Sequence, residues 1–163
     1  MLYPSTDENG TLTNAGQCWS DDDLINILNS VDLPNLATRA GDGDPIRGIN
    51  ATLDWSNTLS LGEQQRLAFG RLLVNRPRFV MMDESTSALD VVAEKKMYML
   101  LKEGLTSTTG DPITFVSVGH RPSIVAFHDI KLLLRDGSGY ASYIPQEASS
   151  AIDQNAILSP MIR

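Results

Sequence analysis

The apolar run at residues 79–82, which leads directly into the carboxylates of Asp83 and Glu84, is the feature that most constrains the fold. A run this short and continuous predicts a β-strand buried on both faces, as in a parallel sheet. A helical pattern at 90–105 and a second apolar run at 113–118 follow it. Strand, helix and strand in this order predict an α/β fold with right-handed crossovers. Ligand sites in such folds lie at the carboxyl ends of the strands, where the two carboxylates stand.

The rest of the chain divides into segments by composition. Residues 1–19 are rich in small polar residues and are expected to be irregular. Residues 20–75 carry helical patterns and predict a small helical subdomain. This subdomain precedes an α/β core at 76–144, in which two further strands are expected after position 130. Residues 145–163 are expected to form a weakly ordered tail.

The composition argues against several classes of protein. The 163 residues carry a formal net charge of −7 and a pI near 4.7, so no nucleic-acid partner is expected. Cys18 is the only cysteine, so no disulfide can form within the chain, and a reducing compartment is expected. No apolar run approaches the ~20 residues needed to cross a bilayer. A protein of this kind that works at a membrane needs a spanning part supplied elsewhere.

Ser60 and Glu63 stand at the start of the last helical pattern before residue 75, with the spacing of a capping box. In that structural interpretation, the Ser60 hydroxyl accepts the N–H of Glu63 while the Glu63 carboxylate returns to the N–H of Ser60. A helix N-terminus also binds phosphate, because its first N–H groups are unpaired and carry a partial positive charge. The hydroxyl of Ser60 and the close backbone approach that Gly62 permits would complete such a site. The spacing is compatible with both interpretations.

The two carboxylates suit phosphate chemistry. A carboxylate at the end of a strand can hold Mg²⁺, usually through water, and its neighbour can polarise a water for attack on a γ-phosphate. The alternative is that an Asp-Glu pair after a strand is merely a surface turn. Asp90, a few residues later, stands where an N-cap for the helix at 90–105 is expected.

These motifs, in this order and spacing, resemble those of an ATP-binding cassette (ABC) ATPase. Residues 59–66 (Leu-Ser-Leu-Gly-Glu-Gln-Gln-Arg) are similar to the signature sequence, residues 79–84 to the Walker B strand, and residues 87–90 to the D-loop. The resemblance covers about half of the chain, from Trp55 to Leu134.

One branch of the family is especially similar. Asp54-Trp55 ahead of the signature and Gly-His-Arg-Pro-Ser at 119–123 resemble subfamily D, the peroxisomal fatty-acyl transporters with bacterial and plastid relatives. Leu61 and Glu63 depart from the usual glycine and glutamine of the signature, and both fit that subfamily.

The resemblance implies roles for particular residues. Asp83 would be the magnesium residue, Glu84 the general base, and His120 the switch histidine that contacts the γ-phosphate. The signature would bind ATP held by a partner domain, and the D-loop aspartate would lie at the dimer seam. The residues implied for this nucleotide binding are Ser60, Gly62, Glu63, Gln64 and Asp90.

The cofactors implied are ATP and Mg²⁺. The partners implied are a second ABC nucleotide-binding domain and a transmembrane domain supplied outside this chain. The ATPase part would then lie on the cytosolic or stromal side of a membrane, and fatty-acyl compounds are the substrates that the subfamily suggests.

The phosphate loop Gly-x-x-x-x-Gly-Lys-[Ser/Thr] has no match in the 163 residues, and the first lysine is Lys95. The expected fold is therefore a partial P-loop NTPase-like parallel sheet that lacks the Walker A half, and Tyr3-Pro4 resembles the segment just after the family's glutamine loop. Positioning of the phosphates supplies most of phosphoryl-transfer catalysis. We therefore expect the chain alone to bind ATP weakly and to hydrolyse it negligibly, and its incomplete sheet to expose apolar surface.

Two other functions remain open. The chain could be a non-catalytic fragment that pairs with or regulates a full-length ABC ATPase by offering only its signature turn. It could also be a soluble ABC protein of DNA repair or translation, although the acidic pI and the subfamily D-like segments argue against this.

Overall fold

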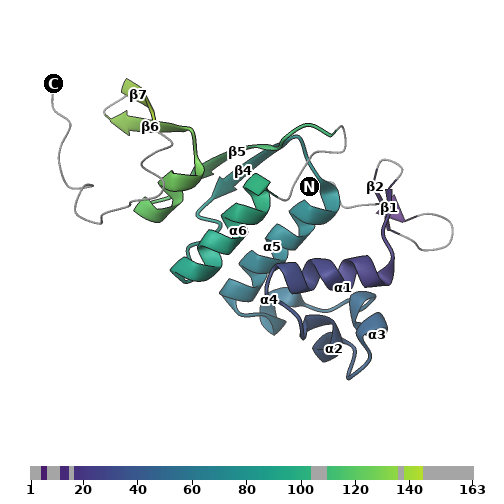
Figure 1. The fold of residues 1–163 in the computed structure, drawn as a ribbon. Coiled ribbons are helices and arrows are strands. Elements are labelled where there is room, and N and C mark those ends of the chain that lie inside the picture. The colour runs from purple at the N-terminus through teal and green to yellow at the C-terminus, as the bar shows by residue number, and fades with distance from the viewer. Residues whose placement is uncertain (1–4, 7–11, 15–16, 104–109, 136–137, 145–163) are drawn as a thin grey trace. The chain divides into compact units, whose positions relative to one another are not determined.

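The computed structural model describes residues 5–6, 12–14, 17–103, 110–135 and 138–144. The chain divides into two compact units, residues 1–117 and 118–163 (Figure 1). The division of the chain expected after residue 75 stays a prediction. The tail expected at 145–163 lies outside the described residues.

The first unit begins with three short strands, β1 (Ser5–Thr6), β2 (Leu12–Asn14) and β3 (Gln17–Cys18), paired antiparallel in that order. The described part of the segment expected to be irregular therefore forms a small sheet. Sequence patterning does not reveal such strands, because two or three residues are too few to show a period.

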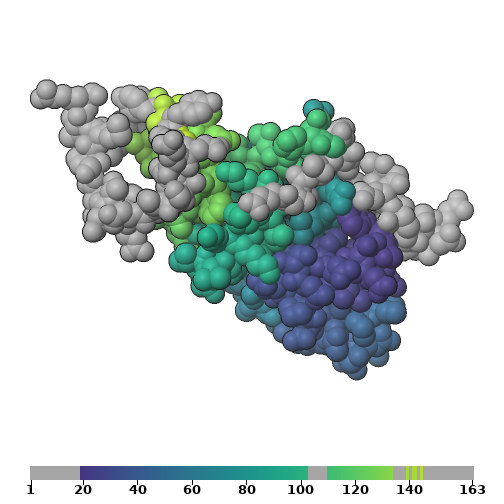
Figure 2. Space-filling view, viewed as in Figure 1, coloured from purple at the N-terminus to yellow at the C-terminus, as the bar shows by residue number. Residues whose placement is uncertain are grey.

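Five helices follow: α1 (Asp21–Ser30), α2 (Leu36–Ala40), α3 (Pro45–Ile49), α4 (Trp55–Thr58) and α5 (Leu61–Asn75). The helical patterns expected within residues 20–75 are therefore confirmed, and the purple and blue surface of Figure 2 shows the first of these helices as one continuous block. The segment at 40–50, rich in glycine, contains α3, because Asp44 caps the N–H groups of Ile46 and Arg47 at 2.9 and 3.3 Å.

The α/β core of this unit consists of β4 (Phe79–Asp83), α6 (Val91–Glu103) and β5 (Thr114–Val118). The two strands are neighbours in a parallel sheet, and the N–H of Thr114 donates to the carbonyl of Arg78 at 3.1 Å. The α/β fold class and the parallel sheet are therefore confirmed. Figure 1 shows α5 and α6 side by side against one face of this sheet.

Burial of β4 on both faces is not observed. Val80 and Met82 are 5% and 4% exposed, whereas Phe79 and Met81, which point to the other face, are 53% and 73% exposed. The composition of the strand is apolar throughout, but helices of the described chain cover only one side of it. The expected exposed apolar surface is thus present on the uncovered face.

The core under the sheet joins both helices to it. The ring of Phe69 on α5 meets Tyr98 on α6 edge-on at 6.4 Å, and Tyr98 meets Phe115 on β5 at 6.2 Å. Burial and the Tyr98 hydroxyl's place beside Glu94 raise the pKa of Tyr98, so this hydroxyl stays protonated and donates to Ser117 Oγ at 3.1 Å.

The second unit contains the 3₁₀ helix η1 (Pro122–Phe127) and the strands β6 (Ile130–Arg135) and β7 (Ser138–Tyr143). The two strands expected after position 130 are present, but they form their own antiparallel pair rather than extending the parallel sheet. In the part of the chain that the structure describes, no helix has the length and apolar character that crossing a membrane requires.

Candidate functional site

The first turn of α5 has the complete capping box that the sequence predicts. The N–H of Ser60 donates to Glu63 Oε2 at 2.9 Å, and the N–H of Glu63 donates to Ser60 Oγ at 3.3 Å. The Ser60 hydroxyl also donates to Glu63 Oε2 at 3.1 Å. The structural interpretation of this serine is therefore confirmed, and its predicted role in binding phosphate stays a prediction.

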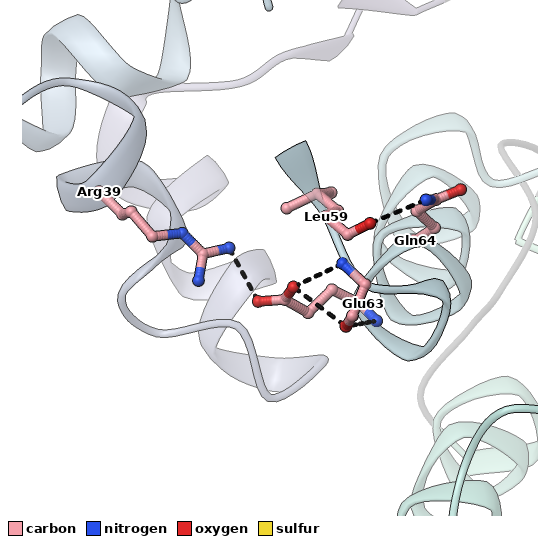
Figure 3. A network of polar contacts seen from close by, with 5 residues as sticks. Arg39, Leu59, Glu63 and Gln64 are labelled. Atoms are coloured by element: carbon pink, nitrogen blue, oxygen red, sulfur yellow. Dashed lines mark hydrogen bonds and ion pairs between the residues drawn. The ribbon is translucent and has the colours of Figure 1, made fainter. Parts of the chain in front are cut away.

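The Glu63 carboxylate is held from a second side by the helical subdomain. Arg39 of α2 donates from Nη2 to Glu63 Oε1 at 2.8 Å (Figure 3). The hydrogen bonds from Arg39 and from the backbone of Ser60 hold the pKa of Glu63 below its usual value, so this carboxyl is ionised at neutral pH. Its negative charge at the start of α5 is partly neutralised by the guanidinium.

The backbone of this turn remains suited to an anion. The N–H of Glu63 is taken by Ser60 Oγ and that of Gln64 by the Ser60 carbonyl at 2.9 Å. Within the described residues, the N–H groups of Leu61 and Gly62, which are the first two of the helix, have no hydrogen-bond acceptor. Ser60 is exposed and the Leu61 side chain is 59% exposed. Two open donors at the positive end of a helix of fifteen residues fit a phosphate group.

Gln64 lies on the inner side of this turn. Its side-chain nitrogen donates to the carbonyls of Leu59 at 2.9 Å and Ser56 at 3.2 Å, and so ties the end of α4 to the start of α5 (Figure 3). The role in nucleotide binding that the resemblance implies for Gln64 stays a prediction.

The second set of predicted residues follows β4. Asp83 is the last residue of the strand and Glu84 begins the turn, and both are exposed. Glu84 has φ of 45°, a left-handed conformation that is rare for a residue other than glycine and costs of order 1 kcal/mol or more. Such outliers are concentrated at functional sites.

The donor set around Asp83 and Glu84 fits magnesium better than a dedicated protein metal centre. Among the residues that the structure describes, no group of three or more His, Cys, Asp or Glu side chains lies together. Mg²⁺ is usually held by one or two carboxylates together with substrate phosphates and water. Two exposed carboxylates at a strand end meet this requirement.

The turn at 84–88 lies directly against the start of α5. A Cβ added to Gly62 would lie 3.3 Å from the carbonyl oxygen of Ala88, so the absence of a side chain permits this approach. The side chain of Gln65 contacts the same turn: its nitrogen donates to Ser87 Oγ at 3.0 Å and to the Glu84 carbonyl at 3.3 Å. The structure thus brings the predicted signature turn and the acidic strand end together within the first unit.

Gln65 is the residue that the sequence interpretation missed. No local sequence pattern predicts the contact of Gln65, because the turn that it binds lies about twenty residues later in the chain. Only the crossing of α5 over the end of β4 makes the contact visible.

The remaining predicted residues are placed as follows. Asp90 accepts the N–H of Ala93 at 2.8 Å, so its predicted role as an N-cap of α6 is confirmed. His120 is exposed and lies in the second unit, at the bend after β5. Next to it, a Cβ on Gly119 would lie 2.7 Å from Ile124 Cδ1, so a larger residue here would displace the end of that side chain. The predicted roles of His120 at a γ-phosphate and of Asp90 at a dimer seam stay predictions.

Comparison with known proteins gives consistent results. The family model described as "ABC transporter" matches residues 3–87. An uncharacterised ABC transporter ATP-binding protein of Synechocystis is 43% identical over 129 residues, which are 78% of this chain and 16% of that protein. ABC transporter D family member 2, chloroplastic, of Arabidopsis thaliana is 42% identical over 108 residues, 66% of this chain and 14% of that protein. A lysosomal cobalamin transporter of Mus musculus is 36% identical over 123 residues, 74% of this chain and 18% of that protein.

Proposed function

This chain belongs to the ABC transporter family, and from this premise we propose that it is the C-terminal part of an ATP-binding and hydrolysing domain that powers transmembrane transport. Its relatives include D-family transporters, and it spans less than a fifth of the length of the three named above. The observation that carries the proposal is the contact between the open start of α5 and the turn after Asp83 and Glu84.

In this proposal the two sets of residues serve different nucleotides. Ser60 and the N–H groups of Leu61 and Gly62 bind the phosphates of an ATP molecule held by a second nucleotide-binding domain. Glu63 supports this turn from within, through its bonds to Ser60. The open donors and the exposure of the turn support this assignment.

Asp83 would hold Mg²⁺, which supplies positive charge against the phosphates when bound. Glu84 acts on the attacking water: its carboxylate accepts a proton from the water as the water approaches the γ-phosphate. The exposure of both carboxylates at a strand end and the left-handed backbone of Glu84 support these roles. His120 is proposed as the residue that contacts the γ-phosphate, on the family resemblance alone.

The proposed partners are a second ABC nucleotide-binding domain and a transmembrane domain, with the ATPase part on the cytosolic or stromal side. Two such domains would enclose ATP between one phosphate loop and the opposite signature turn. We propose a fatty-acyl or other lipid-like substrate, as in the subfamily that the chain resembles.

The 163 residues alone are proposed to hydrolyse ATP negligibly, because they contain no phosphate loop to orient the triphosphate. Purified chain should show no turnover above background, and Glu84→Gln should change nothing. ATP hydrolysis by the chain alone that Glu84→Gln abolishes would contradict this part of the proposal.

A complementation assay tests the signature turn. The nucleotide-binding domain of the Arabidopsis D-family relative is purified with its own signature serine replaced, so that its homodimer lacks a working signature. Adding the 163-residue chain should restore ATP hydrolysis, because the chain supplies Ser60 and Gly62 to the ATP held by the relative. No restoration at any ratio of the two proteins would overturn the proposed role of the turn.

A chimaera tests the acidic pair and the rival function. Residues 55–134 replace the matching segment of the same relative, which retains its own phosphate loop. Glu84→Gln in this chimaera should abolish hydrolysis and leave ATP binding intact, whereas Asp83→Asn should raise the Mg²⁺ concentration needed for half-maximal hydrolysis. If complementation succeeds but Glu84→Gln is without effect here, the non-catalytic pairing function is the correct one.

A further inference from the structure

Gln65 makes a set of hydrogen bonds that none of the proposed catalytic roles uses. Its side-chain nitrogen donates to Ser87 Oγ at 3.0 Å and to the carbonyl of Glu84 at 3.3 Å. Its side-chain oxygen accepts the backbone N–H of Ala88 at 2.9 Å. One half-buried amide thus holds both ends of the turn at 84–88.

The same turn is fixed on its other side by a buried pair. Thr86 donates from Oγ1 to Glu94 Oε2 at 2.9 Å, and the Glu94 side chain is fully buried within α6. The Leu89 side chain is also buried and lies 3.7 Å from a Cβ built on Gly62. The turn is therefore held between α6, through Glu94, and α5, through Gln65.

Glutamine is suited to this place because an amide presents a donor and an acceptor at one end of a side chain. The turn offers two acceptors, the Glu84 carbonyl and Ser87 Oγ, and one donor, the Ala88 N–H. Alanine would meet none of them, whereas glutamate would keep the acceptor for Ala88. A buried or half-buried group that loses its partner costs more than the lost bond itself.

We propose that Gln65 is a positioning residue that joins the start of α5 and the turn at 84–88 into one rigid piece. Gln65 lies one helical turn after the start of α5. A shift of the segment at 84–88 would therefore shift the open N–H groups of Leu61 and Gly62 with it. The inference rests on the proposed function, because the rigid piece is presented to a nucleotide held by the partner domain.

The complementation assay tests this inference with the full 163-residue chain. Gln65→Ala should lower the kcat of restored ATP hydrolysis by about tenfold, as the loss of these bonds suggests. The KM for ATP should change by less than about twofold, since the partner's phosphate loop binds most of the nucleotide. Gln65→Glu should recover part of the kcat. Asn75→Ala is the matched control, because it also removes a side-chain amide from α5. The Asn75 side-chain nitrogen donates to the carbonyl of Arg71 at 2.8 Å, at the far end of the helix.

Hydrogen exchange of the Ala88 amide gives a readout that needs no activity. Gln65→Ala should accelerate this exchange, whereas Gln65→Glu and Asn75→Ala should leave it slow. If the unsubstituted chain fails to complement, the proposed function has failed, and exchange at Ala88 then reports on the contact alone. If the unsubstituted chain complements and Gln65→Ala equals it in kcat, the inference is wrong and the proposed function stands. If Gln65→Ala does not fold, Gln65→Glu decides. The kcat restored by Gln65→Glu must then exceed the kcat restored by Ser60→Ala, and its Ala88 amide must still exchange slowly; a lower kcat or fast exchange would overturn the inference.

Discussion

The starts of α1 and α5 have the same capping chemistry and different electrostatic surroundings. At α1 the N–H of Ser20 donates to Asp23 Oδ2 at 3.0 Å and the N–H of Asp23 donates to Ser20 Oγ at 3.2 Å. The corresponding distances at α5 are 2.9 and 3.3 Å. The two capping boxes therefore satisfy the N–H groups at their helix starts equally well.

Their first turns differ in charge and in contacts. Three aspartates occupy the first turn of α1, at residues 21–23, whereas Glu63 is the only acid in that of α5. Glu63 is paired with Arg39, and Gly62 lets the turn at 84–88 approach. A capping box alone therefore does not distinguish the two helix starts. In the proposed function, the charges around the open N–H groups and the neighbouring turn make only the start of α5 an anion site.

The strongest test gives α5 the first turn of α1. The double variant Leu61→Asp, Gly62→Asp should lower complementation by about a hundredfold, because two added carboxylates within about 4–6 Å of a phosphate are each repelled by about 1–4 kcal/mol. Helix stability should be kept, since acids suit a helix N-terminus, and the Cβ added at position 62, which meets the Ala88 carbonyl, is common to this variant and its control. The double variant Leu61→Asn, Gly62→Asn has nearly the same shape without charge and should lose much less. Equal losses in the two variants would show that shape, not charge, matters.

Removing the cap serines sharpens the comparison. Ser20→Ala and Ser60→Ala should each lower the free energy of unfolding by about 1 kcal/mol, which denaturant titration measures. Only Ser60→Ala should also reduce complementation, by about tenfold, because only its hydroxyl faces a nucleotide in the proposed function. A matching loss of complementation in Ser20→Ala would mean that the assay reports helix stability alone.

The smallest effect concerns Arg39. In Arg39→Met the pKa of Glu63 should rise towards its usual value, while that of Asp23, which its bonds to Ser20 lower, should not move. A lowered folded-state pKa stabilises the fold above the ordinary glutamate pKa, and this contribution disappears as the pH falls through the folded-state value. The stability lost in Arg39→Met should therefore be about 0.2–1 kcal/mol at pH 7 and vanish in acid. NMR titration of the two carboxyl carbons, with thermal melts at each pH, measures both.

Much of the fold was predictable because its signals are local. The capping box at Ser60, the parallel strands of the α/β core and the N-cap role of Asp90 each follow from a few adjacent residues. The positions of the acidic residues at the end of β4 followed from the same patterns.

What sequence patterns missed depends on which surfaces meet. The apolar run of β4 does not say how many of its faces the chain covers, so the exposure of Phe79 and Met81 required the structure. The contacts of Gln65 and Arg39 with residues about twenty or more positions away follow only from how the helices pack. Whether strands after residue 130 extend the sheet or pair with each other is likewise a question of topology.

The backbone of Glu84 has a consequence for how this protein tolerates change. A glutamate held at φ of 45° carries backbone strain in the folded state that glycine would not carry. Glycine at this position should therefore make the folded chain sturdier while removing the carboxylate that the proposed chemistry needs. Selection for fold stability would therefore favour glycine at this position, whereas selection for ATP turnover would favour glutamate.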